Sequence, residues 1–202
     1  ENERWVEDIL SAVDLTNKRV VRLIDSVSAL TEEFAPGMQG EDEGGDELDE
    51  HIWTSPLNAA RMVGAIADAL CAAQPASEDF FRENERQYRQ SLDDLDASLR
   101  DLVNRAARKE LVFGDRFPFR YLADEYGLTY YAAFPGCAHE AEPSAQTIAG
   151  IIDEIRQKDI PVVFHIEQGN ERVTDIIAEE TGAKSMLLHS CHNLTKDEAQ
   201  RG

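Results

Sequence analysis

Apolar residues recur along residues 77–109 with the spacing of one long amphipathic helix. The repeat, at intervals of seven, four and three residues, comprises Phe81, Tyr88, Leu92, Leu95, Leu99, Leu102 and Ala106. Because a helix rises 1.5 Å per residue, about 30 helical residues in this segment would span roughly 45 Å. A compact lobe does not need that length, so the pattern predicts a helix that connects two lobes, with Ser77 as its cap.

Shorter patterns precede this helix. Apolar residues four apart between Trp5 and Val13 predict a short helix. Ser55 and Pro56 suit the cap and the first turn of a second helix. Residues 20–27 fit a helix by spacing, but their β-branched side chains also suit a buried strand, and periodicity leaves both readings open.

After Lys109 short apolar runs alternate with amphipathic segments. The expected strands are Leu111 to Phe113, Tyr130 to Phe134, Val162 to Ile166 and Ser185 to Leu188. The expected helices are Phe119 to Tyr126, Ser144 to Lys158 and Glu171 to Glu180. Gly127 and Gly182 stand where helix ends favour glycine. The alternation predicts a βαβαβαβ unit with a parallel sheet and right-handed crossovers.

Residues that can bind metals, or orient metal ligands, cluster where these strands are expected to end. They are Asp115 after the first strand, Cys137 and His139 after the second, His165 and Glu167 after the third, and His189, Cys191 and His192 after the fourth. Since ligands of such sheets bind beyond the carboxyl ends of the strands, these side chains are expected to converge.

The charge balance restricts the partners. The chain has 40 acidic and 20 basic residues, a formal net charge of −20. Nucleic acids and anionic membranes need a basic surface, so neither is an expected partner, whereas cations are favoured. Seven of the ten residues from Glu41 to Glu50 are acidic. We expect this run to be a solvated loop, with an ion-gathering arm as the alternative.

The three cysteines, Cys71, Cys137 and Cys191, are an odd number without CxxC spacing, which argues against a zinc ribbon and a disulfide framework. Cys71 is expected in the core, whereas a disulfide, free thiols or metal ligation all stay open for the other two.

No run of roughly 20 apolar residues predicts a membrane span. Because the chain begins with Glu1, an export signal or lipid anchor could lie outside it.

The catalytic motifs HExxH, GxSxG, GxGxxG and the P-loop do not occur. This argues against an enzyme, although a metal-dependent hydrolase with an activated water stays an alternative. A noncatalytic adhesion or interaction protein with an acidic surface is a second alternative.

The string from Asp49 to Ala59, DEHIWTSPLNA, resembles the Asp-x-His-x-Trp-x-x-Pro-x-Asn-Ala signature of the zinc and manganese receptors of ABC importers, the cluster A-I solute-binding proteins. The long helix, the βα lobe, the string YLADEYGL from Tyr121 to Leu128, and Glu167 at a strand end are also similar to this family. The resemblance covers most of the chain.

The resemblance implies a metal site. The histidine of the Trp motif, His51 here, is a metal ligand in the family. The next family ligand matches Arg116, which cannot bind a metal, so its neighbour Asp115 is the expected ligand. The last family ligand matches His189. The less certain candidates are Glu167, Cys191 and His192. Such a ligand set favours zinc, with manganese as the alternative ion.

The resemblance also implies the architecture and the role. The fold is expected to be a two-lobed α/β solute-binding protein: residues 1–76 form a partial first lobe with the acidic loop 41–50, residues 77–109 the connecting helix, and residues 110–202 a parallel βα lobe. The start of the first lobe is expected to be missing. The implied role is an extracytoplasmic, lipid-anchored receptor at the bacterial cell surface or in the periplasm, which binds zinc between its lobes and delivers it to an ABC transporter permease.

Overall fold

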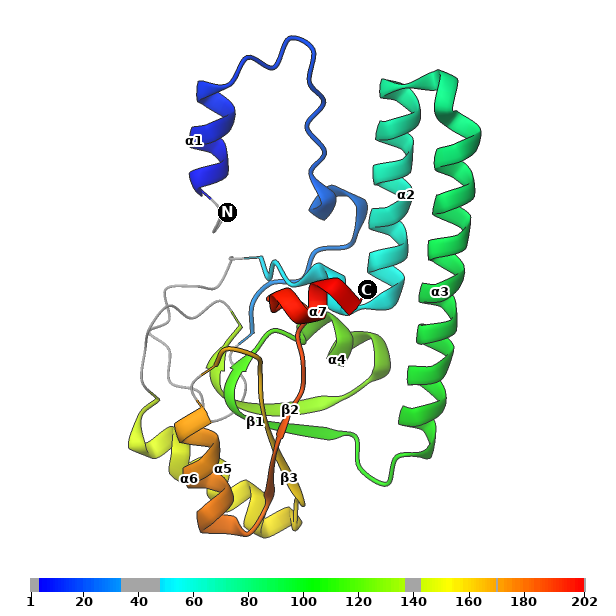
Figure 1. The fold of residues 1–202 in the computed structure, drawn as a ribbon. Coiled ribbons are helices and arrows are strands. Elements are labelled where there is room, and N and C mark those ends of the chain that lie inside the picture. Colours follow the sequence, from blue (N-terminus) through cyan, green and yellow to red (C-terminus); the bar gives the residue numbers. More distant parts are fainter. Residues whose placement is uncertain (1–3, 34–47, 137–142, 170, 202) are drawn as a thin grey trace.

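The structure, a computed structural model, describes residues 4–33, 48–136, 143–169 and 171–201. Its helices are α1 (Arg4–Ala12), α2 (Pro56–Ala73), α3 (Glu78–Arg105), α4 (Arg120–Tyr126), α5 (Ala145–Lys158), α6 (Glu171–Thr181) and α7 (Lys196–Arg201). Its strands are β1 (Glu110–Phe117), β2 (Thr129–Pro135), β3 (Val162–His165) and β4 (Lys184–Leu187). A hairpin of α2 and α3 stands beside a small α/β unit (Figure 1). The α/β class, the parallel sheet and the long helix are as predicted.

The four strands form one parallel sheet in the order β2-β1-β3-β4. The chain leaves β1 toward β2 on one side and returns past β1 to β3 on the other. The carboxyl ends of β1 and β3 therefore flank a topological switch point, the place where open α/β sheets bind ligands.

The first strand is longer than predicted. It continues to Phe117, past the expected end at Phe113, and its pairing with β2 is irregular between Phe113 and Arg116, as in a β-bulge. The prediction that Asp115 follows this strand was therefore wrong, since Asp115 lies within it.

Each face of the sheet is covered by helices. The face under α5 and α6 buries Val112, Ala133, Ile151, Ile155, Ile160, Val163, Ile177 and Ala183. The opposite face, under α4, buries Phe113, Phe117, Phe119, Ala123 and Ala132. Consecutive residues of β1, Val112 and Phe113, are both fully buried on opposite faces, as expected for a central parallel strand.

The start of α2 is as the sequence predicted. The Ser55 hydroxyl accepts a hydrogen bond from the Asn58 amide, and Pro56 occupies the first turn. Ser77 precedes α3 but makes no capping bond with its side chain, contrary to prediction, because the 3-10 turn Pro75–Ser77 leads directly into the helix. The predicted core position of Cys71 is confirmed, as its side chain is buried.

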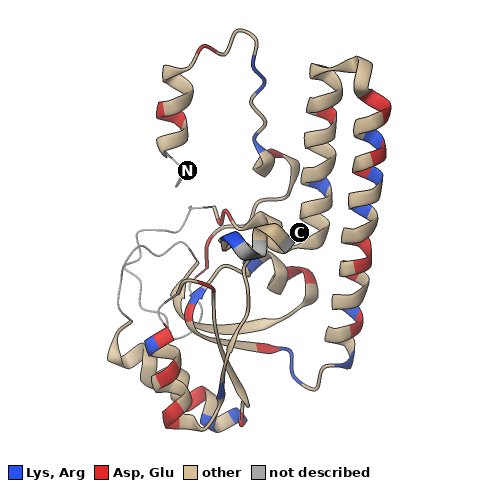
Figure 2. Cartoon of the chain, in the orientation of Figure 1, with Lys and Arg blue, Asp and Glu red and all other residues tan. Residues whose placement is uncertain are grey.

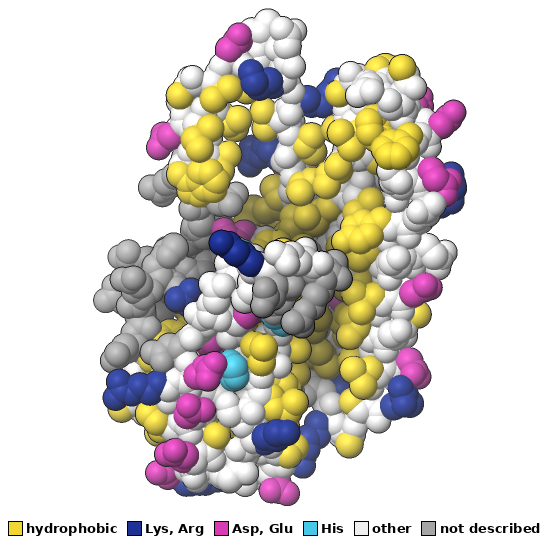
Figure 3. Space-filling view, viewed as in Figure 1, with side chains coloured by type: hydrophobic (Ala, Val, Ile, Leu, Met, Phe, Trp, Pro, Cys, Tyr) yellow, Lys and Arg dark blue, Asp and Glu magenta, His cyan; other side chains and the backbone are white. Residues whose placement is uncertain are grey.

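The outer face of α3 carries alternating acidic and basic residues (Figure 2), several of them paired one turn apart, as Arg100 is with Asp96. Apolar side chains of the hairpin, such as Ile66, Leu70 and Tyr88, are exposed. Figure 3 shows hydrophobic side chains gathered on the visible face of the hairpin. In the described part of the chain, no helix combines the length and the hydrophobicity that a membrane crossing requires.

The segment before α2 is mostly extended. Residues 20–27 form neither of the predicted elements: they are extended except for a 3-10 turn, Leu23–Ser26. The Tyr121 hydroxyl of α4 ties this region to the α/β unit, because it accepts a hydrogen bond from the Leu30 amide and donates one to the Asp49 carbonyl. This tie positions the segment that carries His51.

Close packing of α6 on β1 depends on Gly114. A Cβ atom there would lie 2.6 Å from Cα and from Oγ1 of Thr174. We expect Gly114→Ala to lower the free energy of unfolding by about 2–3 kcal/mol through overpacking. Gly150→Ala is the matched control, since a Cβ on this α5 glycine meets nothing within 4 Å, and it should be neutral or stabilising. Urea unfolding measures both, and equal stability of the two variants would contradict the packing account.

Candidate functional site

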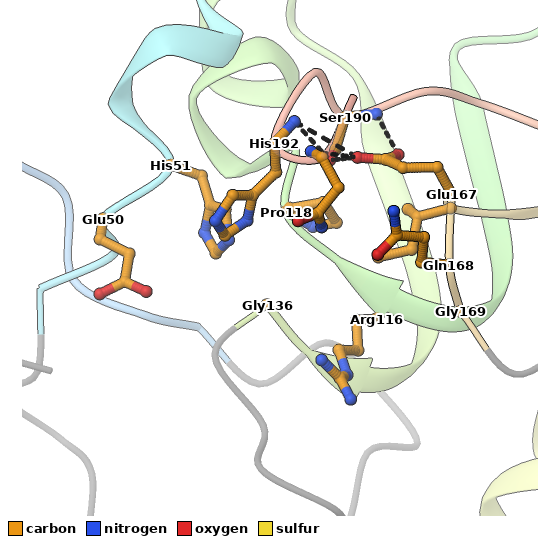
Figure 4. Close-up of a pocket in the computed structure, with 12 residues that line it drawn as sticks. Glu50, His51, Arg116, Pro118, Gly136, Glu167, Gln168, Gly169, Ser190 and His192 are labelled. Carbon is orange, nitrogen blue, oxygen red and sulfur yellow. Dashed lines mark hydrogen bonds between the residues drawn. The ribbon is translucent and has the colours of Figure 1, made fainter. Parts of the chain in front are cut away.

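A pocket of about 310 Å³ lies at the carboxyl ends of the strands, next to the switch point. It is lined by Glu50, His51, Arg116, Pro118, Gly136, Ile166, Glu167, Gln168, Gly169, Ser190, His192 and Asn193. These residues come from the segment before α2, from β1 and from the loops after β1, β2, β3 and β4, and Figure 4 shows several of them around the opening. The pocket therefore joins the two parts of the chain that flank the α2 and α3 hairpin.

His51 is buried, and its orientation is fixed by Asp49. The ring Nδ1 lies 3.0 Å from the Asp49 Oδ1, which also accepts a hydrogen bond from the His51 amide. Asp49 itself is only 1% exposed. A carboxylate on one ring nitrogen leaves the other, Nε2, available for a ligand, and this is the usual arrangement behind a metal-binding histidine.

The backbone after β2 approaches the same imidazole. A Cβ atom on Gly136 would lie 3.2 Å from the Cε1 of His51 and 2.9 Å from the Phe117 carbonyl. A side chain at this position would therefore crowd the ring, and glycine keeps the pocket open beside it.

His192 brings a second imidazole to His51 from the other part of the chain. The two ring centroids are 6.0 Å apart, and the Trp53 ring packs against both, at 5.4 Å from each. The Trp53 indole also donates a hydrogen bond to the Ser190 carbonyl. Because a Zn–N bond is about 2.0–2.1 Å long, rings at this separation are close enough to bind the same ion.

Glu167 organises the turn that carries His192. Its carboxylate accepts hydrogen bonds from the amide and the hydroxyl of Ser190 and from the amides of His192 and Asn193 (Figure 4). Burial favours a higher pKa for Glu167, but the hydrogen bonds from Ser190 and Asn193 outweigh it and lower the pKa below its ordinary value. The ionised carboxylate therefore holds this turn in place.

Asp115 is buried, but it does not line the pocket. Its carboxylate accepts hydrogen bonds from the amides of Ile166 and Arg116, and a Cβ atom on Gly169 would lie 1.9 Å from it. The structure thus places Asp115 under the loop after β3, where it supports the pocket wall. Its predicted role as a ligand stays a prediction.

His189 and Cys191 lie in the same turn as His192 but outside the pocket lining. The His189 Nδ1 accepts a hydrogen bond from the Cys191 amide and lies 3.6 Å from the Glu167 Oε2. Cys191 is exposed and has a positive φ of 60°, so the chain reverses there and directs His192 toward His51. Ligation by His189 or Cys191 stays a prediction.

Within the described residues, no group of three or more His, Cys, Asp and Glu side chains is arranged to hold a metal ion. The predicted candidates Cys137 and His139, and residues 41–47 of the acidic loop, lie outside the described residues. His51 and His192 are thus the two described imidazoles that converge at the pocket. The carboxylates of Glu50 and Glu167 also line it, and Glu167 is engaged by the turn.

Three residues that support the site were not identified in the sequence as functional. Asp49 orients His51, Trp53 contacts both imidazoles, and Ser190 links Trp53 to Glu167. Asp49 and Trp53 belong to the motif that carried the resemblance, so the sequence held a signal for both. Ser190 gave no signal, because its role depends on contacts between distant segments.

Comparison with known proteins gives a consistent picture. Residues 1–200 match the family model described as ZnuA, zinc-uptake complex component A periplasmic. The zinc-binding lipoprotein AdcA of Streptococcus pneumoniae strain R6 is 29% identical over 99% of this chain. The high-affinity zinc uptake system protein ZnuA of Bacillus subtilis is 30% identical over 77% of this chain. The chain spans 40% and 48%, respectively, of these two relatives.

Solved structures resemble the fold over nearly the whole chain. The Zn(II)-bound ZnuA-like domain of Streptococcus pneumoniae AdcA has a TM-score of 0.75 and 27% identity, with 99% of this chain and 69% of that chain covered. The metal-dependent lipoprotein YcdH of Bacillus subtilis has a TM-score of 0.74 and 27% identity, covering 99% of this chain and 70% of that one.

Proposed function

Because this chain belongs to the family of the periplasmic component A of zinc-uptake complexes, we propose that it binds a zinc ion in the pocket at the carboxyl ends of its strands and delivers it to an ABC importer. The observation that carries the proposal is the convergence of His51 and His192 across the pocket. Their imidazoles are suited to zinc.

Two parts of the chain contribute to the proposed site. His51 belongs to residues 1–76, and His192 belongs to residues 110–202, with the connecting segment 77–109 between them. We propose that these parts act as two lobes and that the bound ion links them, since the ion can be ligated from both sides only when they are close. A transporter permease would then recognise the loaded arrangement. This mode of action is binding without catalysis.

The proposed location is outside the cytoplasm. Relatives are named as periplasmic components or as zinc-binding lipoproteins, which supports an extracytoplasmic receptor whose lipid anchor, where there is one, lies outside this chain. The acidic net charge of −20 favours capture of a cation by long-range attraction.

Titration of chelator-stripped protein tests the proposal. We expect one zinc ion per chain, with tighter binding of zinc than of manganese, because imidazole ligands and the general order of affinities both favour zinc. His192→Ala should weaken zinc binding about tenfold or more, since it removes one of the two convergent imidazoles. Isothermal calorimetry measures both. Absence of stoichiometric zinc binding, or an unchanged zinc affinity of His192→Ala, would contradict the proposal.

A further inference from the structure

The pocket is lined by a positively charged side chain that a site for a metal ion alone would not need. Arg116 of β1 lines the pocket with His51 and His192, and in Figure 4 it lies across the pocket from the two imidazoles. Its side chain is exposed, and no ion pair joins it to a carboxylate of the described residues. A guanidinium stays protonated and offers only donors, so it repels a metal ion and cannot ligate it.

The ligand set of the pocket is also incomplete. Zinc in proteins usually has four ligands, whereas the described residues bring two imidazoles together and provide no group of three ligands. Both oxygens of the Glu167 carboxylate already accept hydrogen bonds from the turn at Ser190 to Asn193. Two imidazoles leave coordination positions of a zinc ion open to further ligands, and the neighbouring guanidinium of Arg116 favours an anionic one.

The size of the pocket allows such a ligand. Its volume of about 310 Å³ is at the lower end of the range for small-molecule pockets. A metal ion with a small organic anion therefore fits.

Resting on the proposed function, we propose that the pocket binds zinc together with a small carboxylate anion that bridges the ion and Arg116. One carboxylate oxygen ligates the zinc, and the other carboxylate group accepts paired hydrogen bonds from the guanidinium, a geometry that arginine favours. A dicarboxylate such as malonate has the two groups that this arrangement needs.

For electrostatic reasons, binding of the carboxylate anion is expected to depend on the bound zinc ion. The chain carries a net charge of −20, and Glu50 and Glu167 also line the pocket, so an anion alone is repelled. Once zinc is bound, its two positive charges and the guanidinium attract the anion from both sides. Anion and ion therefore bind cooperatively, and each increases the affinity for the other.

Zinc titrations with and without malonate test this inference. The chelator-stripped protein is titrated at constant ionic strength in sodium perchlorate or sodium malonate, against a chromophoric zinc chelator, with Trp fluorescence as a second readout. We expect malonate to lower the zinc Kd about tenfold or more, and to leave the fluorescence unchanged without zinc. Malonate also binds zinc in solution. This competition raises the apparent zinc Kd of the protein rather than lowering it, and it is the same for every variant.

Variants distinguish Arg116 from a general effect of charge. Arg116→Gln should lose the malonate response, whereas Arg105→Gln, which removes an equal charge from the exposed end of α3, should keep it. Thermal melts check that each variant is folded.

The outcomes separate the two proposals. Zinc binding by the unmodified chain that is equal in both buffers, or a malonate response that persists in Arg116→Gln, would overturn the anion inference and leave the zinc receptor intact. Failure of the unmodified chain to bind zinc in either buffer would overturn the proposed function, and the anion inference with it.

Discussion

Replacing His51 with alanine is expected to weaken zinc binding by at least about a hundredfold. The imidazole is buried at the pocket wall. The Asp49 Oδ1 lies 3.0 Å from its Nδ1 and fixes the orientation of the ring. Loss of an orienting partner alone typically costs 10–100-fold in metal affinity, so loss of the ligand itself should cost more. Calorimetric titration of the chelator-stripped variant measures the effect.

Two further variants serve as comparisons for His51→Ala. Asp49→Asn keeps His51 but weakens its orientation, and it should reduce zinc affinity about 10–100-fold. His165→Ala removes a histidine that ends β3 without lining the pocket, so it should bind zinc like the unmodified chain. Equal affinities of all three variants would show that zinc binds elsewhere.

Glu167→Gln is expected to produce the second large effect, on both stability and zinc affinity. Both carboxylate oxygens of Glu167 accept hydrogen bonds from donors of Ser190 and Asn193. In glutamine one of these oxygens is replaced by an NH2 group, which is itself a donor and cannot accept them. Loss of charge-assisted hydrogen bonds in a partly buried site should lower the free energy of unfolding by about 2–3 kcal/mol. The turn would then hold His192 less firmly, and zinc affinity should fall about tenfold.

The same residue sets a pH dependence. Because the pKa of Glu167 in the folded protein is below its ordinary value of 4.5, its carboxylate contributes stability above about pH 4.5. That contribution is lost as the pH falls through the lower folded-state pKa. Urea unfolding between pH 3 and pH 7 should therefore show a smaller acid loss of stability for Glu167→Gln. Glu180→Gln, at an exposed ion pair with Arg156, should retain the full loss, and identical profiles for both variants would contradict this role.

Local patterns were sufficient to predict most of the fold. The apolar repeat of α3, the capping pair Ser55 and Pro56, and the alternation of strands and helices after Lys109 are all recovered in the structure. These features depend on residues close together in sequence, so periodicity and capping chemistry identify them. Residues 20–27 were ambiguous because packing against α2, rather than their own propensities, decides their conformation.

The details of the site were harder to predict because they depend on contacts between distant segments. Gly114, Asp115 and Arg116 suggested a loop, but β1 continues through them, so that Arg116 lines the pocket and Asp115 lies beneath it. Similarly, the resemblance favoured His189 over His192 as a ligand, whereas in the structure the turn held by Glu167 directs His192 toward His51. Ligation by Asp115, His189 and Cys191 remains a prediction.

Anomalous diffraction at the zinc edge, from crystals of the zinc-loaded protein, would locate the bound ion. We expect one zinc peak in the pocket, about 2.0–2.1 Å from the Nε2 of His51 and within bonding distance of His192. A peak only at the acidic segment, or one in the pocket without contact to His51, would contradict this expectation.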